Sequence, residues 1–193
     1  NRRIGTLLAE GVLGKPVSGR SVFTFPNRDP HNHRWDAHGG GALLDVGIYC
    51  LAPLCAVAGS TTPARLAASA TWTDAGVDAS FSGWLDFGNG FTASFATSFD
   101  APEQQSLDLM GTEATLFVDR PFTAGTADTE LLLRTRAGDT QHLSVPGNDS
   151  YLGMVEHFAR VVRGEEAQQR TVADSIALLG LLDRLRAAAL APR

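Results

Sequence analysis

The hydrophobic residues of this 193-residue chain repeat with two different periods, helical near both ends and alternating in between. Helical spacing predicts helices over residues 2–10, 41–58, 150–163 and 172–190. Alternation of apolar and polar residues predicts strands over residues 17–25, 64–73, 77–87, 91–99, 105–110, 114–118, 130–135 and 140–145. This order of elements predicts a single α+β domain over residues 1–193. We expect two layers, a large, mostly antiparallel open sheet with helices on one face.

Residues 88–90, Gly-Asn-Gly, carry the strongest turn signal, because Asn-Gly between two alternating runs is typical of a tight hairpin. Residues 88–93 also match the G-x-G-x-x-A dinucleotide pattern, but that pattern needs a helix after it and a strand is predicted here. One face of the hairpin is aromatic, whereas the other carries small hydroxyl side chains around Trp84. We interpret the second face either as a solvated surface or as a contact with another copy of the sheet, which would make a homodimer or a larger oligomer.

Composition narrows the classes of function. The net charge is −5 and there is no basic run, which argues against nucleic acids and anionic membranes as partners. No apolar run reaches the roughly 18 residues that a membrane span needs. Cys50 and Cys55 are predicted to be buried, free thiols, which favours a reducing compartment and a cytoplasmic location.

The stretch HGGGALLDVGIYCL, residues 38–51, keeps one carboxylate and one phenol in an otherwise apolar predicted helix. Asp45 and Tyr49 are four positions apart, so both side chains would lie on one face near the helix start. The positive end of the helix dipole favours a carboxylate there, and the glycines let other groups approach the backbone closely. The same spacing also fits an Asp that braces the helix and a Tyr buried in the core, so both interpretations stay open.

The loop before this helix offers a rival kind of site. His31, His33 and His38 form an H-x-H-x4-H pattern that also contains Asp36, and imidazoles with a carboxylate suit Zn²⁺ or Mn²⁺. A metal-binding domain is therefore one alternative function, and a non-catalytic dimerisation module is another. No scaffold strand is evident directly after the loop, so we predict no metal.

Five stretches resemble, in order, the Gfo/Idh/MocA family of oxidoreductases, which includes glucose–fructose oxidoreductase and inositol dehydrogenase. The stretches are LLAEGVLGKPVSG, GGGALLDVGIYCL, FSGWLDFGNGFTASFATSF, LDLMGTEATLFVDRPF and YLGMVEHFARVVRGEE. They extend over essentially the whole chain and are most similar to the branch with glucose–fructose oxidoreductase and dimeric dihydrodiol dehydrogenases. The resemblance implies the substrate-binding and dimerisation C-terminal domain of an enzyme that acts on a sugar, polyol or diol by hydride transfer.

The resemblance also implies a cofactor, NAD or NADP, bound mainly by an N-terminal Rossmann domain. The chain begins without Met, and we expect that domain to be absent from it, which would leave the chain inactive alone. The family's catalytic lysine lies in a Glu-Lys-Pro motif of the Rossmann domain. Gly14-Lys15-Pro16 lacks the Glu, so we interpret it as a structural turn.

By resemblance, Tyr49 occupies the family's proton-transferring position and Asp45 is its acidic partner one turn earlier. Arg34 matches an arginine near the substrate pocket, and Trp35 and Asp36 beside it could bind the hydroxyls and ring face of the substrate. A free tyrosine has a pKa of about 10 and is a poor base at neutral pH. A lysine ammonium from the Rossmann domain would therefore be needed to favour the phenolate.

Overall fold

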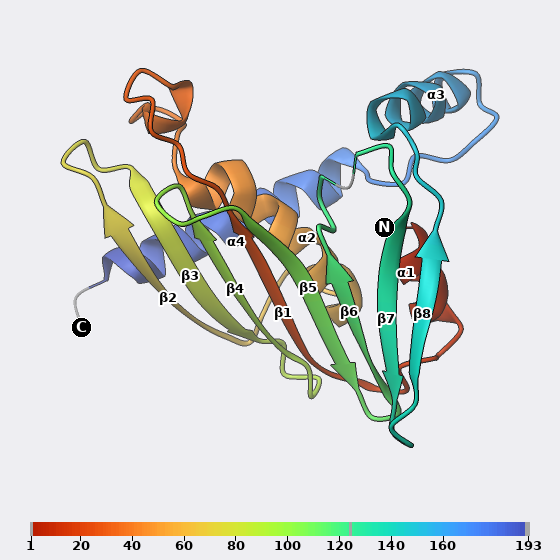
Figure 1. The fold of residues 1–193 in the computed structure, drawn as a ribbon. Coiled ribbons are helices and arrows are strands. Elements are labelled where there is room, and N and C mark those ends of the chain that lie inside the picture. Colours follow the sequence, from red (N-terminus) through yellow and green to blue (C-terminus); the bar gives the residue numbers. More distant parts are fainter. Residues whose placement is uncertain (1, 124, 192–193) are drawn as a thin grey trace.

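The computed structural model describes residues 2–123 and 125–191, which form one eight-stranded sheet with helices packed on it (Figure 1). The strands are β1 (Pro16–Thr24), β2 (Arg65–Trp72), β3 (Asp78–Asp86), β4 (Thr92–Ser98), β5 (Gln104–Gly111), β6 (Ala114–Asp119), β7 (Thr129–Thr135) and β8 (Thr140–Val145). The helices are α1 (Arg2–Ala9), the 3-10 helix η1 (His33–Trp35), the π-helical turn η2 (Leu43–Gly47), α2 (Ile48–Ala58), α3 (Ser150–Val162) and α4 (Val172–Leu190). None of the helices described here is both long enough and apolar enough to cross a membrane.

The strand order is β2-β3-β4-β1-β5-β6-β7-β8, and β1–β4 is the one parallel pair among the described strands. The predicted α+β fold with a mostly antiparallel sheet is therefore confirmed. β1 is the first strand in the chain, yet it lies in the middle of the sheet. It joins the β2–β4 block to the β5–β8 meander, so both blocks depend on its pairing.

Helices α2 and α4 cover one face of the sheet, and the hydrophobic core lies between these two layers (Figure 1). α2 packs on β1 and β4, and α4 packs on β2. The approach of α2 is close, because a Cβ added to Gly19 of β1 would come within 2.6 Å of Leu54 Cδ2. Leu54 is fully buried, at 0% exposure, and it therefore anchors α2 to the sheet.

The predicted hairpin is confirmed, and its turn has a second role. Gly88 and Gly90 have φ values of +72° and +91°, in the region that favours glycine. The register places the small hydroxyl residues of β3 and β4 opposite one another on the same face. Asn89, at the tip of the turn, donates a hydrogen bond from Nδ2 to the backbone carbonyl of Ala58 at 3.0 Å. The turn therefore also holds the end of α2.

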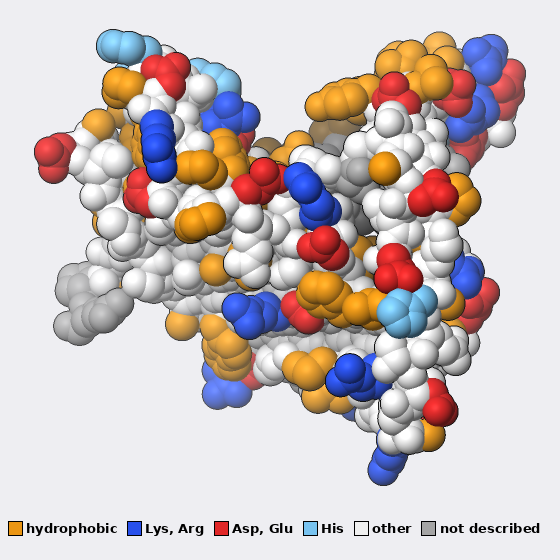
Figure 2. All heavy atoms as spheres, in the orientation of Figure 1, with side chains coloured by type: hydrophobic (Ala, Val, Ile, Leu, Met, Phe, Trp, Pro, Cys, Tyr) orange, Lys and Arg blue, Asp and Glu red, His pale blue; other side chains and the backbone are white. Residues whose placement is uncertain are grey.

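Helix α3 stands apart from the two layers, above the ends of β7 and β8 (Figure 1). None of its residues is buried. Figure 2 shows hydrophobic side chains gathered over this helix, at the upper right. The exposed large apolar residues of α3 and of the first part of α4 form what we call the α3–α4 apolar surface: Tyr151, Leu152, Met154, Val155, Phe158, Val162, Val172, Ile176 and Leu179. An exposed apolar surface of this extent is typical of a contact region.

We expect Leu54→Ala to lower the free energy of unfolding by about 2–5 kcal/mol, because it removes fully buried methyl groups and leaves a cavity between α2 and β1. Urea denaturation followed by circular dichroism measures the change. The matched control is Leu152→Ala on α3, where the side chain is 54% exposed. Its effect should stay within about 0.5 kcal/mol. Equal losses in the two variants would contradict the packing of α2.

Candidate active site

The helix that carries Asp45 and Tyr49 does not begin as an α-helix. Its first turn, Leu43–Gly47, is π-helical, and α2 follows directly from Ile48. The prediction of one α-helix over residues 41–58 was therefore wrong in its first turn, because apolar spacing over a single turn cannot distinguish the two kinds of helix. π-helical turns within longer helices are frequent at functional sites. Both side chains still line the same cavity, as predicted for a shared face.

The glycines before this helix allow two close approaches of other groups. A Cβ on Gly40 would collide with the backbone carbonyl oxygen of Arg34, and a Cβ on Gly41 would collide with a carboxylate oxygen of Asp78. Gly41 also has a φ of +111°. Its N–H donates to the Arg34 carbonyl at 2.9 Å, and the Gly40 N–H donates to the Asp36 carbonyl at 2.7 Å. The glycines therefore fold the preceding loop back onto the start of the helix.

This folding brings Arg34 and Asp45 together. The Arg34 Nε donates to Asp45 Oδ2 at 2.6 Å, with the two side chains 31% and 24% exposed. Asn32 caps η1 by accepting from the Arg34 backbone N–H at 3.1 Å, and the guanidinium lies 5.5 Å from the centre of the Phe25 ring. The predicted substrate-binding arginine and the predicted catalytic carboxylate are thus each other's partner. The arginine is held from three sides.

Tyr49 is half-exposed, at 51%, so the alternative of a tyrosine buried in the core is wrong. Its ring packs at its edges against Phe23 and Phe122, with ring centres 5.9 and 6.0 Å away. These aromatic neighbours themselves stack on one another at 5.3 Å. The phenol ring therefore rests on a rigid aromatic support.

Tyr49 lines two open cavities, each of about 600 Å³. The helix over residues 43–58, which consists of η2 and α2 and carries Asp45 and Tyr49, is called the site helix below. The first cavity lies between the start of the site helix and α4. Its lining residues are His33, Arg34, Gly39, Gly40, Leu44, Asp45, Ile48, Tyr49, Ala52, Arg170, Ser175, Leu178 and Leu179. The second cavity lies between α1, strands β6 and β7, and α3, and Phe122 and Met154 are among its lining residues. The Tyr49 side chain is therefore open to a cavity on each of two sides.

Sequence reasoning missed the wall that α4 contributes to the first cavity. Arg170 precedes this helix and adds a second cation beside Arg34, while Ser175, Leu178 and Leu179 come from its first turns. More than 100 residues separate this wall from the glycine-rich motif in the sequence. Because the sequence shows no local pattern that joins them, only the packing of α4 against α2 brings them together.

Trp35 and Asp36 do not line the first cavity. The Trp35 ring packs edge-on against Phe99, with ring centres 5.1 Å apart. Asp36 pairs with the His38 ring at 3.1 Å, and the His38 backbone N–H holds the pKa of this carboxyl below its usual range. Substrate binding by Trp35 and Asp36 stays a prediction.

The histidines of the loop do not gather into a metal site. Within residues 2–123 and 125–191, no group of three or more His, Cys, Asp or Glu side chains is placed to hold a metal ion. His38 is 97% exposed and faces Asp36, whereas His33 lines the first cavity. The metal-binding alternative built on His31, His33 and His38 therefore receives no support from the geometry.

Three other reactive side chains lie outside this constellation. Cys50 and Cys55 are free and buried, as predicted, and burial raises the pKa of each thiol to about 12. Burial therefore favours the neutral thiol over the nucleophilic thiolate at neutral pH. Lys15 lies in the turn that leads into β1, where its backbone N–H donates to the Thr112 hydroxyl at 3.1 Å. This agrees with a structural turn.

Comparison with known proteins adds three kinds of similarity. A family model described as the GFO/IDH/MocA C-terminal domain matches residues 1–117. D-xylose 1-dehydrogenase (NADP(+)) 2 of Haloferax volcanii is 34% identical over 182 residues, which is 92% of this chain and 55% of that protein. A dTDP-3,4-didehydro-2,6-dideoxy-alpha-D-glucose 3-reductase of Streptomyces violaceoruber is 31% identical over 193 residues, covering 95% of this chain and 56% of the enzyme.

Among solved structures, KijD10, a 3-ketoreductase from Actinomadura kijaniata in complex with NADP and TDP-benzene, has the same fold. The TM-score is 0.84 at 24% identity, and the match covers 97% of this chain and 58% of KijD10. The chain therefore spans little more than half the length of these relatives.

We expect the Arg34–Asp45 pair to show a coupling energy of about 1–2 kcal/mol in a double-mutant cycle with Arg34→Ala and Asp45→Ala, because the pair is charged, hydrogen-bonded and mostly shielded from water. Urea denaturation of the four proteins gives the value. The control cycle uses Arg163 and Glu165, which pair at 2.7 Å but are each more than half exposed. Its coupling should be smaller and should vanish sooner as salt is added. Indistinguishable couplings would show that Arg34 and Asp45 are not held together.

Proposed function

The chain belongs to the GFO/IDH/MocA family as a C-terminal domain, and from this premise we propose that it is the substrate-binding half of an NADP- or NAD-dependent oxidoreductase. The substrate class we propose is a secondary alcohol or ketone of a sugar, polyol or diol. The relatives support this class, since they include a xylose dehydrogenase, sugar ketoreductases and trans-1,2-dihydrobenzene-1,2-diol dehydrogenases. The dinucleotide would supply or accept the hydride when bound.

One observation carries the proposal: a half-exposed phenol lies at the junction of two cavities, next to a shielded arginine–carboxylate pair. Removal of a hydride from a secondary alcohol must be matched by loss of the hydroxyl proton, and the reverse reaction needs a proton donor. A positioned tyrosine hydroxyl serves either direction. We therefore assign proton transfer to the Tyr49 hydroxyl.

The other cavity residues have complementary roles in this proposal. Asp45 neutralises Arg34 and fixes its Nε, so the remaining guanidinium N–H groups can donate to substrate hydroxyls. Ile48, Ala52 and Leu178 form an apolar wall against which the carbon face of a sugar or diol can pack. Charged and apolar walls facing each other are typical of sites that bind small polar molecules.

The glycine pattern of residues 88–93 is not a dinucleotide-binding turn. Residues 88–93, which match the dinucleotide pattern, form a hairpin turn followed by β4 instead of a helix. We propose that a separate Rossmann domain outside this chain holds the cofactor. The α3–α4 apolar surface supports this division, because its residues border both cavities. Its large apolar side chains are exposed to solvent in this chain, and such surfaces are typical of contacts with another domain or protein.

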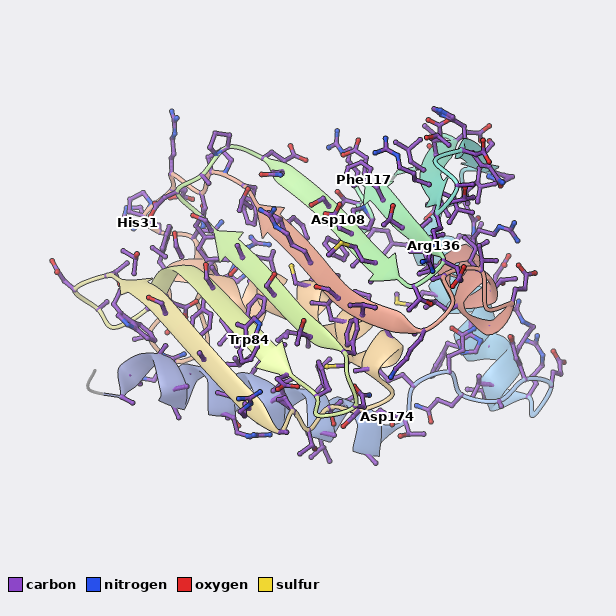
Figure 3. All side chains as sticks on the ribbon, turned by 90° about the horizontal axis from the view of Figure 1, so that it is seen from below. His31, Trp84, Asp108, Phe117, Arg136 and Asp174 are labelled. Atoms are coloured by element: carbon purple, nitrogen blue, oxygen red, sulfur yellow. The ribbon has the colours of Figure 1, made fainter. Side chains whose placement is uncertain are left out.

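We also propose that the uncovered face of the sheet contacts a second copy. Trp84, Met110 and Phe117 are 41%, 46% and 37% exposed, and Figure 3 shows Trp84, Asp108 and Phe117 spread over β3, β5 and β6. In Figure 2, which looks onto this face, hydrophobic side chains gather in the lower half among arginines and carboxylates. Aromatic residues, Met and Arg are enriched at subunit interfaces.

We keep the cytoplasm as the proposed location. Cys50 and Cys55 are both free, and their burial protects them without a disulfide. Free thiols are typical of reducing compartments. The location itself stays a prediction.

We expect Tyr49→Phe to lower kcat of the full-length enzyme by roughly 10² or more, because the variant loses the transferred proton and keeps the aromatic packing. The assay follows NADPH absorbance with aldoses, diols and keto sugars as substrates. Tyr151→Phe is the matched control, since it removes the chain's other phenol hydroxyl but keeps the apolar ring on the α3–α4 apolar surface, and it should keep normal turnover. Normal turnover in Tyr49→Phe would remove this tyrosine from the mechanism. Absence of turnover by the wild-type protein across the panel would refute the proposed function.

We expect Trp84→Glu to convert the dimer into a monomer in light scattering coupled to size exclusion, because a carboxylate would be buried without a partner at the sheet face. Leu190→Glu is the control, with a side chain that is 61% exposed on α4, on the helical side of the sheet. It should leave the oligomeric state unchanged. An unchanged mass in Trp84→Glu, or a monomeric wild-type protein, would contradict the use of this face.

A further inference from the structure

Asp78 is a buried carboxylate that the proposed mechanism does not use. It is the first residue of β3 and is 0% exposed. Its Oδ2 accepts the Leu43 backbone N–H at 2.7 Å. Its Oδ1 has no hydrogen-bond partner in the part of the chain that the structure describes. An ionisable side chain in this position needs an explanation, because buried carboxylates are rare unless they are paired.

The start of the site helix needs an acceptor from outside itself. The first N–H groups of any helix have no partner within the helix. Ala42, at the N-cap position, has no side chain that could accept them. Asp78 accepts from Leu43, the first residue of η2, and therefore caps the helix from the neighbouring sheet. A carboxylate at this end also interacts favourably with the helix dipole.

The same carboxylate is in contact with Gly41, the glycine whose backbone is hydrogen-bonded to both Arg34 and Asp45. A Cβ on Gly41 would collide with Asp78 Oδ1, so the carboxylate and the backbone touch there. Gly41 donates its N–H to the Arg34 carbonyl at 2.9 Å and accepts the Asp45 N–H at 3.0 Å. A shift of Gly41 would therefore disturb one backbone hydrogen bond to each member of the Arg34–Asp45 pair.

We propose that Asp78 is a positioning residue for the proposed reaction: from β3 it caps the helix that carries Tyr49 and fixes Gly41, which sets the Arg34–Asp45 pair beside the phenol. The catalytic part of this inference rests on the proposed function, whereas the structural part, a cap supplied from the sheet, does not.

Burial also disfavours the ionised form of this carboxyl. Burial raises the pKa of Asp78, and the hydrogen bond from the Leu43 N–H only partly opposes this. A carboxyl whose pKa is higher in the folded state stabilises the fold when it is protonated, and that contribution is lost as the pH rises through the folded pKa.

The test uses the full-length enzyme and two variants with the branched heavy-atom skeleton of Asp, of which Leu is the bulkier because methyl groups replace the oxygens. Asp78→Asn keeps an oxygen that can accept the Leu43 N–H, whereas Asp78→Leu removes the acceptor without leaving a cavity. Asn89→Ala is the control, because it breaks the contact at the other end of the same helix, with the Ala58 carbonyl. Each protein is assayed for kcat, KM, melting temperature and amide exchange of residues 41–49.

We expect Asp78→Leu to lower kcat by about tenfold or more with a smaller change in KM, since a misplacement of about 1 Å has effects of this size. Asp78→Asn should recover most of the turnover. Asn89→Ala should keep kcat within about twofold, even if its melting temperature falls as far as that of Asp78→Leu. Faster amide exchange at residues 43–45 should occur in Asp78→Leu and not in Asn89→Ala. Asp78→Ala serves as a second acceptor-free variant, with the same expectation, if Asp78→Leu does not fold.

The inference is overturned if Asp78→Leu loses no more kcat than Asn89→Ala, if Asp78→Asn recovers none of the loss, or if exchange at residues 43–45 is unchanged. These outcomes are separate from a failure of the proposed function. A wild-type protein without oxidoreductase activity would refute that function, while the exchange measurement would still decide whether Asp78 caps the helix.

Discussion

The close backbone approach at Gly40 and Gly41 is the constraint on which the candidate site depends. Any side chain at these positions would collide with the Arg34 carbonyl or with the Asp78 carboxylate. The loop could then not fold back onto the helix, and Arg34 could not reach Asp45. The charged pair, and with it the loop side of the first cavity, follows from this one contact region. The glycine run thus acts through the space it leaves free, more than through flexibility.

Most of the fold could be predicted from the sequence, because each element carries its own pattern. Alternating residues gave the strands to within one residue at their ends, and Asn-Gly marked the hairpin between β3 and β4. The position of β1 could not be predicted in this way. Its place between β4 and β5 is decided by edge-to-edge pairing of distant strands, and alternation within a strand does not specify its neighbours. The exposure of α3 was also not predictable, since its apolar residues suggest a buried face that the described chain does not provide.

The site was predictable where it depends on local spacing and not where it depends on packing. Asp45 and Tyr49 were identified from one turn of helix, and the structure brings both to one cavity. The partner of Asp45 was not foreseen, because Arg34 reaches it only through the folded glycine loop. Arg170 enters the same cavity from α4, and no periodicity links it to residues more than 100 positions earlier. Spacing therefore placed Asp45 and Tyr49 on one face and the family resemblance implied their roles, whereas their surroundings could be found only from the structure.

The β3–β4 hairpin holds the site helix at both of its ends. Asp78, where β3 begins, accepts from Leu43 at the start of the helix, and Asn89, in the turn after β3, donates to Ala58 at its end. Between these points Leu54 packs onto β1 with no exposed surface. The start of the helix, which carries Tyr49, cannot slide or tilt without breaking the buried contacts of Asp78 and Leu54, whereas the contact of Asn89 lies at the far end. A proton-transferring group needs such a support, because its efficiency falls steeply when its oxygen moves by a fraction of an ångström to about 1 Å. The half-exposed phenol can therefore face an open cavity and still keep a defined position.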